Sequence, residues 1–438
     1  MSVELKQQKL KVSNMAEHLI GSEIIKLANE VNELIKKGEP IANLTIGDFD
    51  PSVFPIPALL RDEIIKAYME GHTNYPVANG MPDLRKEVSS FIKRFQNLDY
   101  SADEVLIAGG ARPVIYGIYS TIIDPGDKVV YPVPSWNNNH YCHLMQANGV
   151  AVEVFPENNF MPTADNLRPH LKDARLLALC SPQNPTGTVM SEAQLRAICE
   201  LVIEENNSRN ADEKPLYIMY DQIYSALTFG DNKHYDPVTL YPELRPYTIF
   251  VDGLSKSIAA TGIRVGWAFG PATIIDKMKS ILSHIGAWSP KAEQIASARF
   301  MANYQEFDRY IDSFKKDVFE RLEAFYQGFQ SMSSLGVNCI APMAAIYLTV
   351  QFDIKGKTTA TGKLLATSED ITEFILNEAK MAVVPFSAFG AGGSSILSIW
   401  CCEGFNMVSI VSRNLQNRKY SCDDGSIEKC ALVVEIIE

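Results

Sequence analysis

The sequence predicts an α/β protein in which a mostly parallel sheet is sandwiched by helices and is followed by a smaller α+β region. Three observations predict this class. From residue 104 onward, short apolar runs alternate with helix-length segments, which is typical of parallel strands joined by crossover helices. Several runs are apolar throughout, as strands buried on both faces are. A polar residue or a glycine follows one run after another, which is expected where parallel strands end at one edge.

The composition is that of a globular chain and excludes several classes of function. With 438 residues the chain is long enough for two domains. Its net charge of −12 argues against binding to nucleic acid or to anionic membranes. Residues 1–10 are polar, and no apolar run approaches the roughly 20 residues that span a bilayer, so we expect a cytoplasmic protein. The eight cysteines form no C-x-x-C pair, which favours reduced thiols and no metal site.

The first 50 residues are expected to form an N-terminal arm, a helix and a short strand over residues 41–46. This strand ends in a turn at Gly47, which is either a plain turn or a place where the backbone approaches a ligand. Helices are predicted over residues 57–69 and 82–95, joined by a loop rich in proline and glycine.

Six strands are predicted between residues 104 and 251. They cover residues 105–108, 127–131, 150–155, 176–180, 216–220 and 248–251. Just past five of these strands lie Gly110, Trp136, Asn184, Asp221 and Lys256. Each of the five has an ordinary structural explanation as a turn or packing residue. Together they indicate a single ligand site, because the carboxyl ends of parallel strands share one edge of the sheet.

The last third of the chain has a different pattern of elements. A long, charged helical stretch is predicted over roughly residues 291–332. It is followed by a strand at 344–351, a helix at 369–380 and a strand at 381–385. This mixture predicts a second, smaller domain of the α+β type.

Lys256 and Arg264 carry the most specific chemical signal. A lysine at the end of a buried strand is unfavourable unless its charge is paired or its amine is covalently occupied. Arg264 stands between Gly262 and Gly266, which suggests an anion held close to the backbone. The glycine turn at Gly110 opens a helix, whose free N–H groups also favour an anion. A covalently anchoring lysine and a phosphate-binding arginine together suggest pyridoxal phosphate.

Pyridoxal phosphate needs several groups from a protein, and this sequence offers a residue for each. Lys256 would form the Schiff base and move the substrate proton. Asp221 would pair with the pyridine N–H group and raise the pKa of that nitrogen. Asn184 and Tyr224 would donate hydrogen bonds to the ring hydroxyl. Trp136 would stack on the ring. The phosphate would be bound by Gly110, Ala111 and Arg264.

On these residues the chain resembles the class I/II aminotransferases of the fold-type I pyridoxal-phosphate superfamily, and in particular bacterial aspartate aminotransferase-like proteins. The resemblance covers roughly residues 20–395. The matching motifs are Asn184-Pro185-Thr186-Gly187, Asp221-x-x-Tyr224, Ser255-Lys256 with Arg264, Tyr75 with Gly80, Leu84 and Arg85, and the Gly47 turn.

The resemblance implies a mostly parallel, seven-stranded sheet in a large cofactor-binding domain over residues 51–295. Residues 1–50 would form an arm and part of a small domain, which residues 296–438 complete. The small domain would be of the α+β type. A homodimer with shared active sites is implied, in which Tyr75 reaches the cofactor phosphate of the neighbouring subunit.

The resemblance also implies the chemistry. Pyridoxal 5'-phosphate would be bound covalently as a Schiff base on Lys256, beside Ser255, with Asp221 and Tyr224 as the other catalytic residues. The reaction would move an amino group between an L-amino acid, with aspartate as the first choice, and a 2-oxo acid. The residues implied near the substrate are Gly47, Trp136 and Asn184, with Gly47 near its carboxylate.

Ile396 stands where this family carries the arginine that binds the substrate carboxylate. The family has a pattern like Arg-Leu-Ser after the Val-Pro-Phe strand, whereas this chain has Ile396-Leu397-Ser398. No arginine occurs between Arg321 and Arg413. Isoleucine has no side-chain donor, so we expect carboxylate binding to be badly weakened. Residues 396–438 form an atypical tail in which cysteines are frequent.

Three explanations for Ile396 stay open: a frameshift near this residue, a diverged or impaired enzyme, or a different local register. The alternative functions are a pyridoxal-phosphate lyase or decarboxylase, and a pyridoxal-phosphate-binding protein with impaired turnover. A nucleotide-binding oxidoreductase is least favoured, because the G-x-G-x-x-G fingerprint is absent. Residues 284–290 are placed near the substrate side chain and contain no arginine for a second carboxylate.

Overall fold

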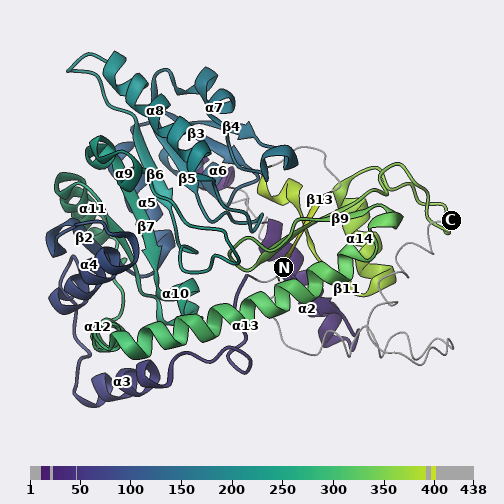
Figure 1. Ribbon diagram of the computed structural model, residues 1–438, viewed down its shortest axis with the longest axis horizontal. Helices are drawn as coiled ribbons and strands as arrows, with labels where there is room; N and C mark the ends of the chain where they lie inside the picture. Colours follow the sequence, from purple (N-terminus) through teal and green to yellow (C-terminus); the bar gives the residue numbers. More distant parts are fainter. Residues whose placement is uncertain (1–10, 20–22, 46, 391–395, 401–438) are drawn as a thin grey trace, which may run out of the picture.

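The computed structural model describes residues 11–19, 23–45, 47–390 and 396–400, and it confirms the predicted fold class (Figure 1). The largest sheet among these residues has seven strands in the order β2-β8-β7-β6-β5-β3-β4. These strands are β2 (Val105–Ala108), β3 (Lys128–Val133), β4 (Asn148–Glu153), β5 (Ala174–Cys180), β6 (Tyr217–Asp221), β7 (Thr248–Gly253) and β8 (Gly266–Phe269). All neighbours are parallel except β8, which is antiparallel to both β2 and β7.

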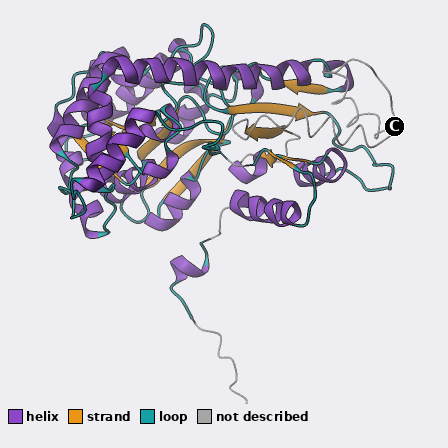
Figure 2. Ribbon diagram, turned by 90° about the horizontal axis from the view of Figure 1, so that it is seen from below, coloured by secondary structure: helices purple, strands orange, loops and turns teal. Residues whose placement is uncertain are grey.

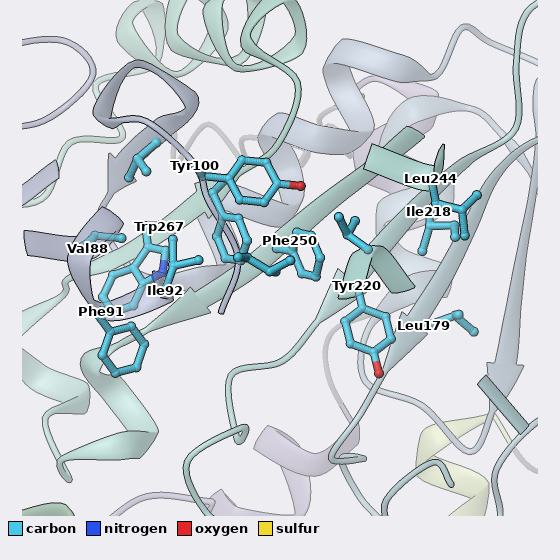
Figure 3. Packing of buried hydrophobic residues seen from close by; sticks show 14 of the residues in the cluster. Val88, Phe91, Ile92, Tyr100, Leu179, Ile218, Tyr220, Leu244, Phe250 and Trp267 are labelled. Carbon is cyan, nitrogen blue, oxygen red and sulfur yellow. The ribbon is translucent and has the colours of Figure 1, made fainter. Parts of the chain in front are cut away.

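The central strands β5, β6 and β7 are covered on both faces, which explains why most of their residues are apolar. Successive side chains of a strand point to opposite faces. Accordingly, Ile218 and Tyr220 of β6 pack in one hydrophobic cluster and Met219 packs in another. Figure 3 shows part of the first cluster, in which Ile218 and Tyr220 lie with Leu179 of β5 and Phe250 of β7.

Helices lie on both sides of this sheet (Figure 2). Among the helices that contribute to the first cluster are α4 (Pro82–Gln96), α7 (Ala164–Leu171), α8 (Glu192–Ser208) and α12 (Lys291–Ala302). Those that contribute to the second are α5 (Ala111–Ile122), α6 (Asn138–Met145) and α11 (Ala272–His284). Helix α3 (Ala58–Met69) packs on α12. The short helices are α1 (Asn14–Glu17), α9 (Pro237–Leu240) and α10 (Leu254–Ser257).

A smaller, antiparallel sheet has the order β12-β13-β10-β9. Two of its strands, β9 and β13, are labelled in Figure 1. Its strands are β9 (Val337–Cys339), β10 (Tyr347–Phe352), β12 (Val384–Pro385) and β13 (Ile396–Trp400). Helix α13 (Tyr304–Gln330) extends from α12 to β9 and β10. The remaining helices are α2 (Glu23–Lys36) and α14 (Ser368–Ala379). The domain boundaries at residues 50 and 295 stay a prediction.

The N-terminal segment pairs with a distant part of the chain. Strand β1 (Ala42–Asn43) lies parallel to β11 (Met381–Ala382), so the segment before Gly47 is held beside the second half of the protein. Both strands are shorter than the runs predicted around them.

Among the described helices, none is both long and apolar enough to cross a bilayer.

The predicted helical stretch 291–332 is divided into α12 and α13 at Asn303. The side chain of Asn303 accepts a hydrogen bond from the backbone N–H group of Glu306 (3.3 Å) and so caps the second helix.

Within the predicted tail, residues 401–438 lie outside the described part of the chain.

Candidate active site

A cavity of about 510 Å³ lies at the carboxyl ends of the parallel strands. The last residues of β5 and β6 line it, together with the segment after β3, the beginning of α5, and Tyr347 of the smaller sheet. The predicted site residues that line this cavity are Gly47, Ala111, Trp136, Asn184, Asp221, Tyr224, Ser255, Lys256 and Arg264. The structure therefore brings together residues that span more than 200 positions of the sequence.

Lys256 lies on α10, the short helix that directly follows β7. Its Nζ atom donates a hydrogen bond to the carbonyl oxygen of Gly47 and lies 5.4 Å from the centre of the Phe49 ring. The N-terminal segment therefore forms part of the wall around this lysine. The Asp48 side chain strengthens that wall by accepting a hydrogen bond from the hydroxyl of Thr261.

Asp221 is the last residue of β6 and faces the cavity. One carboxylate oxygen accepts a hydrogen bond from the backbone N–H group of Ile223 (3.1 Å). No cationic side chain in the described part of the chain pairs with it. Burial raises the pKa of Asp221 to about 6, and the hydrogen bond from Ile223 opposes that rise. A carboxylate in this position favours a ligand that brings a positively charged N–H group.

Asn184 follows β5, and its bond to Pro185 is cis. Its Oδ1 atom is buried and has no hydrogen-bond partner among the described residues. A buried polar atom without a partner is unfavourable, so this amide is suited to a polar group of a ligand. Tyr224, which shares the cavity wall, is hydrogen-bonded through its hydroxyl to the hydroxyl of Tyr347.

An anion site lies at the beginning of α5. The Arg264 guanidinium donates one hydrogen bond to the backbone carbonyl oxygen of Gly109 and one to that of Thr261, and each nitrogen–oxygen distance is 2.8 Å. Gly110, with a φ of 102°, is the N-cap of α5, so the first N–H groups of this helix have no partners within the helix. Free N–H groups, the helix dipole and a guanidinium beside them are the ligands expected for a phosphate group.

Trp136 lines the cavity together with Arg112, a residue that the sequence argument did not single out. The guanidinium carbon of Arg112 lies 5.2 Å from the centre of the Trp136 ring. The sequence does contain a signal for this residue, because Arg112 is a cation that closely follows the glycine turn of the predicted anion site. The other polar lining residues that were missed are Thr45, Asp48, Ser135, Asn138, Cys180, Thr261 and Tyr347.

Two predicted residues are not brought into the cavity of their own chain. Gly110 is the N-cap of α5 and is not among the residues that line the cavity. Tyr75 is 81% exposed, and its ring packs edge-on against Trp288 with centroids 5.3 Å apart. Ile396 begins β13 opposite Gln351 of β10, but its side chain lies outside the described residues. The expectation about the missing arginine therefore stays a prediction.

The residues present fit pyridoxal phosphate. A lysine, a carboxylate that lacks a cationic partner and a buried amide with an unused polar atom share one cavity with an aromatic ring. The anion site lies on the same wall, formed by Arg264 and the beginning of α5. Each chemical part of this cofactor therefore has a matching protein group.

Comparisons with known proteins identify relatives of this chain. The family model "Aminotransferase class I and II" matches residues 39–403. The chain is 30% identical over 393 residues to an aspartate aminotransferase of Geobacillus stearothermophilus, covering 89% of this chain and 94% of the relative. It is 32% identical over 371 residues to a probable aspartate/prephenate aminotransferase of Rickettsia felis, covering 82% and 85%. The crystal structure of the aspartate aminotransferase from Rhizobium meliloti is similar with a TM-score of 0.84 and 26% identity, covering 93% of this chain and 97% of that one.

Proposed function

Because the chain belongs to the class I and II aminotransferase family and is a pyridoxal-phosphate-dependent aminotransferase, we propose that it acts on a dicarboxylic amino acid of the aspartate type. Its substrates are an amino acid and a 2-oxo acid, as for other members of the family. The relatives named above are aspartate or aspartate/prephenate aminotransferases, which supports the choice of an acidic substrate. Lyase or decarboxylase activity is not favoured by these relatives.

The observation that carries the proposed substrate is the position of Arg112. Three cationic side chains line the described cavity, namely Arg112, Lys256 and Arg264. Arg264 is held by backbone carbonyl groups at the anion site. The Arg112 guanidinium makes no side-chain hydrogen bond within the described residues and lies over the Trp136 ring. A guanidinium in this state is suited to bind a carboxylate through two parallel hydrogen bonds.

We propose the following roles for the residues of the cavity. When bound, pyridoxal phosphate supplies an aldehyde that condenses with amines and a ring that withdraws electrons from the substrate Cα. Lys256 anchors the cofactor and then moves a proton to and from the substrate Cα. Asp221 keeps a proton on the ring nitrogen, because its carboxylate lacks another cationic partner.

The other proposed roles concern binding. Arg264 and the first N–H groups of α5 bind the phosphate, with Ser255 beside them. Asn184 and Tyr224 donate hydrogen bonds to the ring hydroxyl. Trp136 covers the ring and excludes water from the cavity. Gly47 approaches the substrate carboxylate from the N-terminal segment, where its carbonyl group already contacts Lys256.

A substrate panel tests the proposed function. The purified holoenzyme is assayed with L-aspartate, L-glutamate, L-alanine and L-phenylalanine, each paired with 2-oxoglutarate or, for L-glutamate, with oxaloacetate. We expect kcat/KM to be highest for the two acidic amino acids, because only they offer a second carboxylate to Arg112. Equal values for all four amino acids, or a preference for L-phenylalanine or L-alanine, would contradict the proposed substrate class.

We also propose that the enzyme is a homodimer. Its Tyr75 ring is exposed and is not among the residues that line its own cavity, which suits a contact with the cofactor phosphate of a second subunit. The loop around Tyr75 is held by a hydrogen bond from Lys291 to the side chain of Asn74 (2.7 Å) and by the ring of Trp288. The cytoplasmic location expected from the sequence stays a prediction.

A further inference from the structure

The side chains of Asp252, Gln222 and His234 are joined by hydrogen bonds, and Gln222 stands in the sequence between two residues that line the cavity. The Gln222 amide nitrogen, Nε2, donates to Oδ2 of Asp252 (3.2 Å), and its Oε1 lies 3.2 Å from Nε2 of His234. Gln222 is fully buried and Asp252 is 3% exposed. None of the three is among the residues that line the cavity, so contact with a substrate does not explain them.

Each of these three side chains has a defined role as donor or acceptor. The Gln222 oxygen can only accept, so the His234 ring must carry its proton on Nε2. Burial lowers the pKa of His234 to about 4, which keeps the ring neutral near neutral pH. The other oxygen of Asp252 accepts the backbone N–H group of Gly253 (2.7 Å). Contacts at both ends therefore determine how the Gln222 amide is oriented.

The bond between Gln222 and Asp252 joins the two segments that carry Asp221 and Lys256. Gln222 directly follows Asp221 at the end of β6, and Asp252 lies near the end of β7, ahead of the helix that carries Lys256. The backbone ladder between β6 and β7 ends at the pair Asp221–Val251. The side-chain bond thus continues the connection beyond the ladder, at the point where both segments turn toward the cavity.

Apolar side chains could also join these two segments, and they would not require a carboxyl group to be buried. The buried Asp252 carboxyl group therefore needs an explanation other than packing. Burial raises the pKa of Asp252 to about 8, and the neighbouring Asp221 adds to that rise. A hydrogen bond sets both the distance and the direction between its partners, which apolar packing does not. These properties suit a contact that determines where a catalytic group lies.

We propose that the hydrogen bond between Gln222 and Asp252 fixes the position of the Asp221 carboxylate relative to the Lys256 amine, which makes Gln222 and Asp252 positioning residues for amino transfer. The inference rests on the roles proposed above for Asp221 and Lys256. Loss of the bond lets these two side chains shift relative to each other. The chemical step is then slowed, whereas the residues that contact the substrate are unchanged.

Exchanging the two side-chain groups tests this inference. Asp252→Asn alone brings an amide N–H group opposite the Gln222 amide N–H group, and Gln222→Glu alone brings two carboxyl groups together. The double variant Q222E/D252N places a donor opposite an acceptor again and leaves His234 a carboxylate oxygen to which it can donate. Three quantities are measured on the holoenzyme: the pH midpoint of the visible absorption band, the dissociation constant of pyridoxal phosphate, and the rate constant of the first half-reaction with L-aspartate.

We expect each single variant to shift the pH midpoint, weaken cofactor binding and lower the rate constant about tenfold or more at nearly unchanged KM. The double variant is expected to lie within about threefold of the wild type. The inference is overturned if the single variants keep the wild-type midpoint, affinity and rate constant, or if a folded double variant stays as impaired as they are. If a single variant does not fold, Gln222→Met removes the same bond, and the same expectations apply.

A matched control separates positioning from stability. Thr248→Val removes another buried hydrogen bond of β7, from the Thr248 hydroxyl to the carbonyl group of Leu244 (3.0 Å). This variant should unfold at a lower temperature, but the pH midpoint of its visible absorption band should be unchanged. A shifted pH midpoint would show that the loss of any buried hydrogen bond in β7 has the same effect. Wild-type turnover of L-aspartate is measured in parallel. Its absence would contradict the proposed substrate, while the midpoint and the cofactor affinity still test the positioning role.

Discussion

Arg264 and Gly110 lie so close together that no side chain fits between them. A Cβ atom on Gly110 would lie 2.9 Å from Cζ of Arg264 and nearer still to Nη2. Gly110 has a φ of 102°, and Nη2 of Arg264 donates to the carbonyl group of the preceding Gly109 (2.8 Å). The backbone of this turn and the guanidinium therefore form one unit at the beginning of α5, where we place the cofactor phosphate.

Gly110→Ala should weaken binding of pyridoxal phosphate. The new methyl group displaces Arg264, and the left-handed backbone is strained in any residue with a Cβ. We expect the dissociation constant, from absorbance titration of the cofactor-free protein, to rise about tenfold or more. Gly126→Ala is the control, because Gly126 has a φ of 87° but its Cβ would meet nothing within 4 Å. An equal loss of affinity in both variants would contradict the role of the Arg264 contact.

Asp221 should make the cofactor-free protein less stable as the pH rises. Its pKa is about 6 in the folded state against 3.8 ordinarily, so the folded state binds this proton more tightly than the unfolded state. The contribution to stability is complete below about pH 4 and is lost as the pH rises to about 6. Its size is at most about 3 kcal/mol. Urea unfolding of the wild type and of Asp221→Asn across this range measures the difference, and a difference that does not change with pH would refute the assignment.

Arg112→Gln should change substrate preference more than cofactor binding. Loss of a guanidinium that pairs with a carboxylate is expected to lower kcat/KM for L-aspartate by about 10- to 100-fold. The value for L-alanine, which has no second carboxylate, should change less than about threefold. Arg112→Lys keeps the charge but not the paired donors, so it should lie between the wild type and Arg112→Gln. If the dissociation constant of pyridoxal phosphate rises instead, Arg112 binds the phosphate and not the substrate.

Tyr75 and Lys256 should complement each other between subunits. Lys256→Ala loses the covalent anchor and the proton carrier, so its activity should fall by about 10⁴-fold or more. Tyr75→Ala should weaken cofactor binding in the neighbouring subunit. When the two variants are mixed and allowed to exchange subunits, every heterodimer contains one site with both native residues, so activity should return. Mixed dimers that form but stay inactive would contradict a shared active site.

The sheet and most of the cavity residues could be predicted because both depend on the order of apolar and polar residues. Asn184 and Lys256 follow strands that are mostly apolar and Asp221 ends such a strand. Parallel strands bring these positions to one edge of the sheet. Strand β8 (Gly266–Phe269) was missed as a strand, since its apolar run does not show that it enters the sheet antiparallel to its neighbours. Asn303 was missed as a helix boundary, because an asparagine cap is a weaker signal than proline or glycine.

The residues that were missed depend on three-dimensional contacts. Arg112 is one of 40 lysines and arginines, and only the fold shows that it faces the cavity. Gln222 and Asp252 are far apart in the sequence, and their contact follows from the pairing of β6 with β7. For Ile396 the structure describes the backbone of β13 alone, so the prediction that this enzyme lacks the carboxylate-binding arginine of its family still depends on the sequence.

The central claim is that Lys256 performs amino transfer with an acidic amino acid, and a single half-reaction tests it most directly. Cofactor-loaded protein is mixed with L-aspartate in the absence of any 2-oxo acid, and the absorption spectrum and the products are followed. We expect the visible band to be replaced by that of pyridoxamine phosphate, with release of oxaloacetate in an amount equal to the bound cofactor, and no such change in Lys256→Ala. An unchanged spectrum without oxaloacetate, or release of ammonia without pyridoxamine phosphate, would contradict the claim.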